Sequence, residues 1–135
     1  FKFIYFWFQY FKSKIRLKKI SSNWGVDLIV KDILKKKKGG IYVDVGCHHP
    51  LINNNTNILY INGWKGVNID LDYNSIDMFN YFRPNDNNIE IALSNKKGQS
   101  NLYFFHNRAA KNTIVKSRGK GAKSIKKTCE RSVRI

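Results

Sequence analysis

The sequence predicts an α/β fold built around parallel strands. Two short apolar runs, 41–45 and 67–69, are separated by an asparagine-rich polar turn and a further apolar segment. The first run stops at Gly46, and the second follows Gly66 and ends in acid at Asp70. Two parallel strands joined by a crossover helix explain this spacing, because a parallel pair needs a connection of about a dozen residues or more.

A chain of 135 residues forms one domain or part of one. Its 42% of hydrophobic residues suffice for one core, with none to spare. The sequence starts at Phe1 rather than Met, so we expect a fragment of a longer protein. We expect an aromatic and basic N-terminal helical segment (1–38), a central α/β half-domain (39–107) and a basic, mobile C-terminal segment (108–135).

The net charge of +16 lies in the flanks of the chain. Residues 1–38 and 108–135 each carry +9, whereas residues 39–107 carry −2. A duplex-binding domain places its positive charge on the folded surface that meets phosphate, so the pattern does not favour a nucleic-acid partner. Cys47 and Cys129 belong to no CxxC pair, which predicts a reducing, cytoplasmic compartment and no disulfide framework.

Residues 1–11 are strongly aromatic, and a basic stretch, 12–19, follows them directly. The aromatic stretch is too short to span a bilayer, which takes about 20 apolar residues. We expect residues 1–19 to lie at a membrane surface as a peripheral contact, to be the end of a truncated hydrophobic segment, or to pack against the domain or a partner. A cleavable signal peptide is not favoured, because its basic region would precede the apolar one.

Residues 21–38 predict a helix, because their apolar residues recur at helical spacing and Ser22 or Asn23 can cap its start. Residues 35–38 are all lysine and place positive charge at the C-terminal end, where the helix dipole favours it. Two glycines then end the helix. This role explains the lysine run without a polyanion.

Several further segments follow the central unit. We expect a helix over 75–82, a third strand over 88–93, a polar turn over 95–98 and a fourth strand over 101–105 that pairs with the third as a hairpin. Residues 107–127 have few apolar anchors, so we expect a mobile loop or disorder there.

The turn at Gly46 has a chemical use. A glycine at a strand end lets the backbone approach a ligand, and an acid that ends the next strand, Asp70, can accept hydrogen bonds from ribose hydroxyls. Asp70 lies 24 residues after Gly46, close to the spacing expected of that role. Residues 47–50 are Cys-His-His-Pro, so the G-x-G-x-x-G fingerprint is absent and a pyrophosphate cradle is not favoured. A nucleoside without phosphates, such as S-adenosyl-L-methionine, fits better.

Several ordered motifs in residues 40–107 resemble those of the FkbM family of S-adenosyl-L-methionine-dependent methyltransferases. They are YVDVGCHHP, NNT, NGWKGVNIDLD, RP, and IALSNKKG followed by NLYFF. The resemblance implies a Rossmann-like class I methyltransferase sheet, truncated here after the third or fourth strand. It also implies an enzyme that methylates a hydroxyl oxygen on a sugar, such as a glycan, or on another small molecule. Because the acceptor-side motif has no counterpart, we expect the chain alone to be poorly stable, to bind cofactor weakly and to lack activity.

The resemblance also implies which residues bind the cofactor. Asp44 and Gly46 match the first-strand motif that approaches its methionine part. Asp70 matches the acid that binds the ribose hydroxyls, with Asp72 as a competitor for that role. The whole expected set is Asp44, Gly46, Cys47, Asn55, Thr56, Asp70, Ala92 and Ser94.

The other members of this set have weaker assignments. Asn55 and Thr56 match the pair that opens the first helix, and helix capping alone would also explain them. Ala92 and Ser94 match the segment after the third strand, near the adenine. Cys47 lies in the turn itself, and we expect it to pack rather than to act as a nucleophile.

The adjacent histidines His48 and His49 do not predict a metal site, because neighbouring histidines rarely point at one ion and no set of acidic or cysteine ligands completes one. We assign neither of them as the catalytic base, which stays unidentified. Trp64 is expected to anchor the turn in which it lies.

Two other classes of protein stay open. One is a non-enzymatic membrane-surface or polyanion-binding protein that uses the basic flanks, whose binding would depend strongly on salt. The other is half of an NAD-dependent oxidoreductase, which the missing glycines disfavour. The sequence does not define the oligomeric state.

Overall fold

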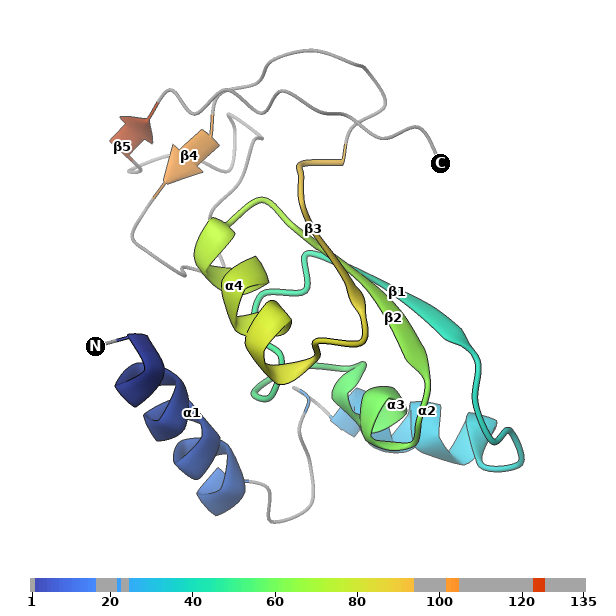
Figure 1. Cartoon of the computed structure of the whole chain (residues 1–135). Coiled ribbons are helices and arrows are strands. Elements are labelled where there is room, and N and C mark those ends of the chain that lie inside the picture. Colours follow the sequence, from blue (N-terminus) through green and yellow to red (C-terminus); the bar gives the residue numbers. More distant parts are fainter. Residues whose placement is uncertain (1, 17–21, 23–24, 94–101, 105–122, 126–135) are drawn as a thin grey trace.

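The computed structural model describes residues 2–16, 22, 25–93, 102–104 and 123–125 (Figure 1). Its elements in chain order are α1 (Lys2–Arg16), α2 (Val26–Leu34), β1 (Ile41–Val45), α3 (Asn57–Ile61), β2 (Lys65–Asp70), α4 (Tyr73–Phe82), β3 (Asn87–Glu90), β4 (Leu102–Phe104) and β5 (Lys123–Ile125).

Strands β1, β2 and β3 form a parallel sheet in that order. Val43 pairs with Val67, and Val67 pairs in turn with Asn87. Helices α3 and α4 make the two connections, as parallel pairing requires. The predicted α/β class, the two central strands and the crossover between them are confirmed. Strand β3 ends at Glu90, three residues before its predicted end at Leu93.

A hydrophobic cluster holds β1 to helices α2 and α3. Tyr42 of β1, Leu59 of α3 and Trp64 are buried, and Val30 and Leu34 of α2 pack against them. Burial of such large side chains stabilises the fold by about 1.5–3 kcal/mol each. The cluster therefore fixes both helices on the Tyr42 side of the strand.

Two glycines make room for the aromatic rings of this cluster. A Cβ atom on Gly40 would lie 2.5 Å from the Trp64 ring, and one on Gly66 would lie 2.3 Å from the Tyr42 ring. Real Cβ atoms essentially never approach a neighbour closer than 3.0 Å. Trp64 is therefore a structural anchor, as predicted.

The apolar residues of β1 alternate between a covered and an open side. Tyr42 is 7% exposed, whereas Ile41, Val43 and Val45 are 77%, 57% and 57% exposed. Successive side chains of a strand point to opposite faces. The face of β1 that bears Ile41, Val43 and Val45 is therefore open.

Helix α2 is shorter than predicted. It begins at Val26, after Gly25 in the left-handed conformation with φ of 70°. The backbone N–H of Asp27 donates to Ser22 Oγ at 3.0 Å, so Ser22 does satisfy an amide of the first turn. The helix ends at Leu34, and the predicted extension through residues 35–38 is wrong, because turns replace the helix there.

Helix α4 begins two residues earlier than predicted. Asp72 is its N-cap, and Asp72 Oδ1 accepts a hydrogen bond from the backbone N–H of Asn74 at 2.9 Å. The cap lets Tyr73 and Asn74 join the helix, which packs through Ile76 and Phe79. This role accounts for the acid at position 72 without a ligand.

The predicted hairpin between the third and fourth strands is wrong. Strand β4 pairs antiparallel with β5, with Leu102 opposite Ile125, and β3 pairs with β2. Strand β5 also shows that 123–125, within the stretch expected to be a mobile loop, are ordered. The main chain supplies the hydrogen bonds of a ladder, so a short segment within a stretch rich in lysine and serine can pair. The predicted turn at 95–98 lies outside the described residues.

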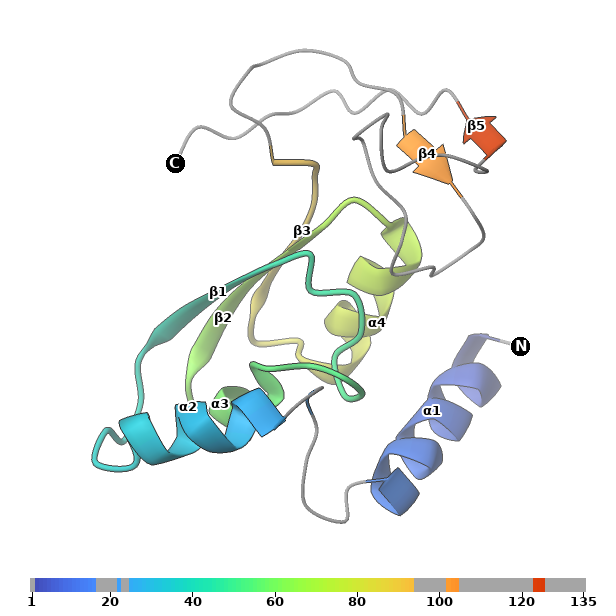
Figure 2. The same cartoon turned by 180° about the vertical axis from the view of Figure 1, so that it is seen from behind.

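Helix α1 packs on α4 at the side of the molecule away from β1 (Figures 1 and 2). Phe6 is 2% exposed, and its ring centroid lies 4.9 Å from that of Tyr81 and 5.9 Å from that of Phe82. Within the ranges that the structure covers, none of the helices combines the length and apolar character needed to cross a membrane.

Candidate functional site

The carboxyl ends of β1 and β2 lie side by side. The backbone N–H groups of Gly46 and Cys47 both donate to the Ile69 carbonyl oxygen, at 2.8 and 3.2 Å. Gly46 has φ of 72°, and a Cβ atom there would meet nothing within 4 Å. The chain therefore turns sharply at the strand end and leaves open space beside the turn.

Asp70 ends β2 and holds this turn. Its Oδ2 accepts from the backbone N–H of His48 at 2.8 Å, and its Oδ1 accepts from the backbone N–H of Asp72 at 2.9 Å. Each carboxylate oxygen has a second lone pair for another donor. Burial raises the pKa of Asp70, although both backbone hydrogen bonds act in the opposite direction.

Asp44, the second-last residue of β1, ties the strand to the start of α3. Its Oδ2 accepts from Thr56 Oγ1 at 2.7 Å and from Asn54 Nδ2 at 3.1 Å. Asn54 Nδ2 also donates to the Cys47 carbonyl at 3.3 Å. Because both donors that the described residues give Asp44 fall on Oδ2, its other oxygen is available to a ligand.

A buried arginine that the sequence analysis did not place in the site organises the loop from β1 to α3. Arg83 is 0% exposed. Its Nη1 donates to Thr56 Oγ1 at 3.0 Å, and its Nη2 donates to Asn54 Oδ1 at 2.8 Å and to the Pro50 carbonyl. One planar guanidinium thus fixes three points of the loop.

The same guanidinium reaches the sheet through a tyrosine. Arg83 Nη1 donates to the Tyr42 hydroxyl at 3.0 Å, and that hydroxyl donates to Asp86 Oδ2 at 2.6 Å. Asp86 Oδ1 accepts from the backbone N–H of Gly66 at 2.8 Å. Burial, reinforced by the hydrogen bond to Asp86, raises the pKa of Tyr42 and keeps it a neutral donor. Asp86 therefore balances the buried positive charge through a hydroxyl group.

Five of the eight predicted site residues meet in this region. They are Asp44, Gly46, Cys47, Thr56 and Asp70. A sixth, Ala92, is buried just after β3, where the N–H of its neighbour Ile91 donates to the Asp70 carbonyl at 2.8 Å. Their cofactor-binding roles stay predictions.

The remaining two predicted residues have different outcomes. Asn55 is exposed, and its neighbour Asn54 takes the buried place in the network. Ser94 lies outside the described residues. The sequence contained one indication that Arg83 is special. It is one of few basic residues in the mildly acidic segment 39–107, and it lies between an aromatic residue and a proline.

The two histidines hold the backbone of the loop. His49 is buried, and its Nδ1 accepts from the backbone N–H groups of Leu51 and Ile52, each at 3.1 Å. An acceptor nitrogen carries no proton, so the ring is in the tautomer protonated at Nε2. The described part of the chain contains no cluster of three His, Cys, Asp or Glu side chains able to hold a metal ion.

Cys47 is expected to be chemically inert in the folded chain. It is 4% exposed, and burial raises the pKa of its thiol, an effect to which the charges of Asp70 and Asp44 add. In a Cys129→Ser variant, we expect Ellman's reagent to react with Cys47 at least about 100-fold more slowly than in denaturant, because only the thiolate attacks. Reaction at the rate of an exposed thiol would contradict this placement.

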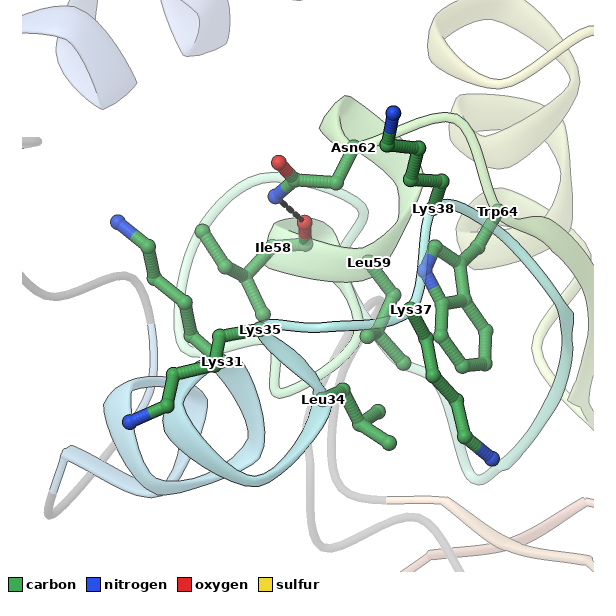
Figure 3. A pocket seen from close by; sticks show the side chains of 9 residues that line it. All are labelled: Lys31, Leu34, Lys35, Lys37, Lys38, Ile58, Leu59, Asn62 and Trp64. Atoms are coloured by element: carbon green, nitrogen blue, oxygen red, sulfur yellow. Dashed lines mark hydrogen bonds between the residues drawn. The ribbon is translucent and has the colours of Figure 1, made fainter.

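A concave feature lined by lysines, the basic pocket, lies at the opposite end of β2. It has a volume of about 350 Å³, a floor that includes Leu59 and Trp64, and four lysines around it: Lys31, Lys35, Lys37 and Lys38. Figure 3 shows that the four lysine side chains point away from one another. At about 3.3 Å per strand residue, the two ends of β2, Lys65 and Asp70, lie roughly 17 Å apart.

The fold and the site define an α/β protein with a polar loop at the carboxyl edge of a parallel sheet. No model of a known protein family, no curated protein and no solved structure matches the chain.

Proposed function

We propose that the chain binds S-adenosyl-L-methionine at the carboxyl edge of its sheet, within a class I methyltransferase that acts on a hydroxyl of a sugar or another small molecule. The observation that carries this proposal is the position of Asp70 at the end of β2, beside the glycine turn that ends β1. In open parallel sheets, ligands bind outside the carboxyl ends of the strands.

The donors and acceptors of the turn fit an adenosyl ligand. Asp70 keeps one lone pair on each oxygen, which suits the two hydroxyls of a ribose. Asp44 keeps one oxygen for the ammonium of the methionine part. The open space at Gly46 allows a ligand to approach the backbone. No phosphate-binding glycine loop is required for this ligand.

The proposed reaction requires alignment above all. S-adenosyl-L-methionine, when bound, would supply a methyl group activated by its sulfonium for transfer to an acceptor hydroxyl. Asp70 and Asp44 would orient the cofactor, while Arg83 holds the loop that carries their partners. Cys47 stays a thiol and His49 holds backbone amides, so neither is assigned as the base that takes the hydroxyl proton.

A second candidate, polyanion binding, is favoured by the four lysines of the basic pocket. Their side chains diverge, so they suit a broad negative surface better than one small anion. Such binding depends strongly on salt, because it releases counterions.

A calorimetric titration distinguishes these functions. We expect S-adenosylhomocysteine to bind with little change between low and high salt, and NAD to give no comparable heat. Heparin serves as the polyanion probe. Heparin binding that salt abolishes, in a folded chain without S-adenosylhomocysteine binding, would overturn the proposal in favour of the second candidate.

A further inference from the structure

Helix α1 carries an exposed apolar stripe. Ile4, Trp7, Phe8 and Phe11 follow the i, i+3, i+4, i+7 spacing that places side chains on one side of a helix. They are 71%, 55%, 62% and 54% exposed. Single exposed apolar residues are ordinary, whereas a continuous apolar stripe of this kind marks an interaction surface.

Most of the stripe points away from α4, although Trp7 at its edge also lines a groove with Tyr81 and Phe82. At 3.6 residues per turn, Phe6 lies nearly opposite the stripe, and it is the residue that α1 buries against Tyr81 and Phe82 of α4. Docking through Phe6 therefore leaves Ile4 and Phe8 facing outward. Figure 1 shows α1 at the periphery, next to α4.

The charges on α1 define what can cover the stripe. Lys12 and Lys14 are exposed and lie on the two flanks of the stripe, and Lys14 Nζ sits 5.4 Å from the centroid of the Tyr10 ring. No acidic residue precedes Asp27 in the sequence. A second copy of α1 would bring like charges together, whereas an anionic surface would neutralise them.

We infer that α1 lies in the plane of an anionic lipid surface, with its apolar stripe inserted and its lysines at the headgroups. Tryptophan, tyrosine and phenylalanine favour the interfacial region, and lysines on the flanks of an apolar stripe can reach anionic headgroups. The inference does not depend on the proposed cofactor.

Vesicle co-sedimentation tests the inference with the full chain. We expect binding to phosphatidylcholine vesicles that contain phosphatidylserine and at least about tenfold weaker binding without it. The variant Ile4→Ser/Phe8→Ser should lose most of this binding. A matched variant, Ile29→Ser/Ile33→Ser, removes two exposed isoleucines of α2 (59% and 74%) and should bind as the original chain does.

Other outcomes would overturn the inference. Equal vesicle binding by the original chain and Ile4→Ser/Phe8→Ser would show that charge elsewhere is responsible. If the original chain does not bind vesicles but forms a dimer, and Ile4→Ser/Phe8→Ser is monomeric, a second copy covers the stripe. Lys12→Gln/Lys14→Gln should lower the preference for phosphatidylserine, and circular dichroism checks that each variant is folded.

Discussion

Replacing Arg83 with methionine is expected to lower the free energy of unfolding by about 3–5 kcal/mol, the usual cost of breaking a buried charged network by removing one partner. The change removes the guanidinium N–H groups that donate to the side-chain oxygens of Tyr42, Thr56 and Asn54. Each of these oxygens then has one donor fewer in the folded chain. The Asp86 carboxylate also loses its nearby positive charge. Urea unfolding followed by circular dichroism measures the effect.

Two further variants test whether geometry or charge is responsible. Lys37→Met also replaces a positively charged residue by methionine, but at an exposed position, and should leave the unfolding midpoint nearly unchanged. Arg83→Lys keeps the charge and loses the planar fork, so it should recover only part of the lost stability. An Arg83→Met chain as stable as Lys37→Met would contradict the central role of the guanidinium.

Replacing Asp70 with alanine is expected to weaken S-adenosylhomocysteine binding by about 10- to 100-fold, because a hydrogen bond to a charged group contributes about 1.5–3 kcal/mol. Asp72→Ser is the matched control, since serine keeps the N-cap of α4 and removes the competing carboxylate. Calorimetry of both variants compares the two acids directly. Greater loss in Asp72→Ser would assign the ribose to Asp72.

The raised pKa of Asp70 predicts opposite pH trends for stability and binding. A folded pKa above the unfolded value adds stability at low pH, and that stability is lost as pH rises through the folded pKa. Ribose hydroxyls bind better to the carboxylate, so cofactor affinity should rise across the same interval. Asp70→Asn should remove both trends, and an unchanged profile in that variant would contradict the assignment.

Local patterns predicted the elements that carry their own apolar or turn signals. The β-branched residues of 41–45 and the apolar run that ends at Asp70 form neighbouring strands, and the Asn- and Asp-containing turns start helices. The observed boundaries differ from the predicted ones by a few residues, because single capping side chains such as Asp72 decide where a helix begins.

Pairings and contacts that leave no local pattern could not be predicted in this way. Strand β4 pairs with β5 through main-chain hydrogen bonds, which carry no side-chain pattern in a sequence rich in lysine. In the sequence, Arg83 directly follows the predicted helix over 75–82. Only the folded chain brings its side chain to Asn54 and Thr56. Asn55 was predicted from the Asn-Thr pair of the family resemblance, and its cofactor role stays a prediction. The contact of the neighbouring Asn54 with Arg83 had no signal in the local sequence.

The most direct test of the cofactor site is an amide NMR titration of the isotope-labelled chain with S-adenosylhomocysteine. The proposed site predicts chemical-shift changes at Gly46, Cys47, His48 and Asp70, with the lysine-lined pocket around Trp64 unaffected. Changes confined to that pocket, or none in a chain whose spectrum shows a folded protein, would contradict the account.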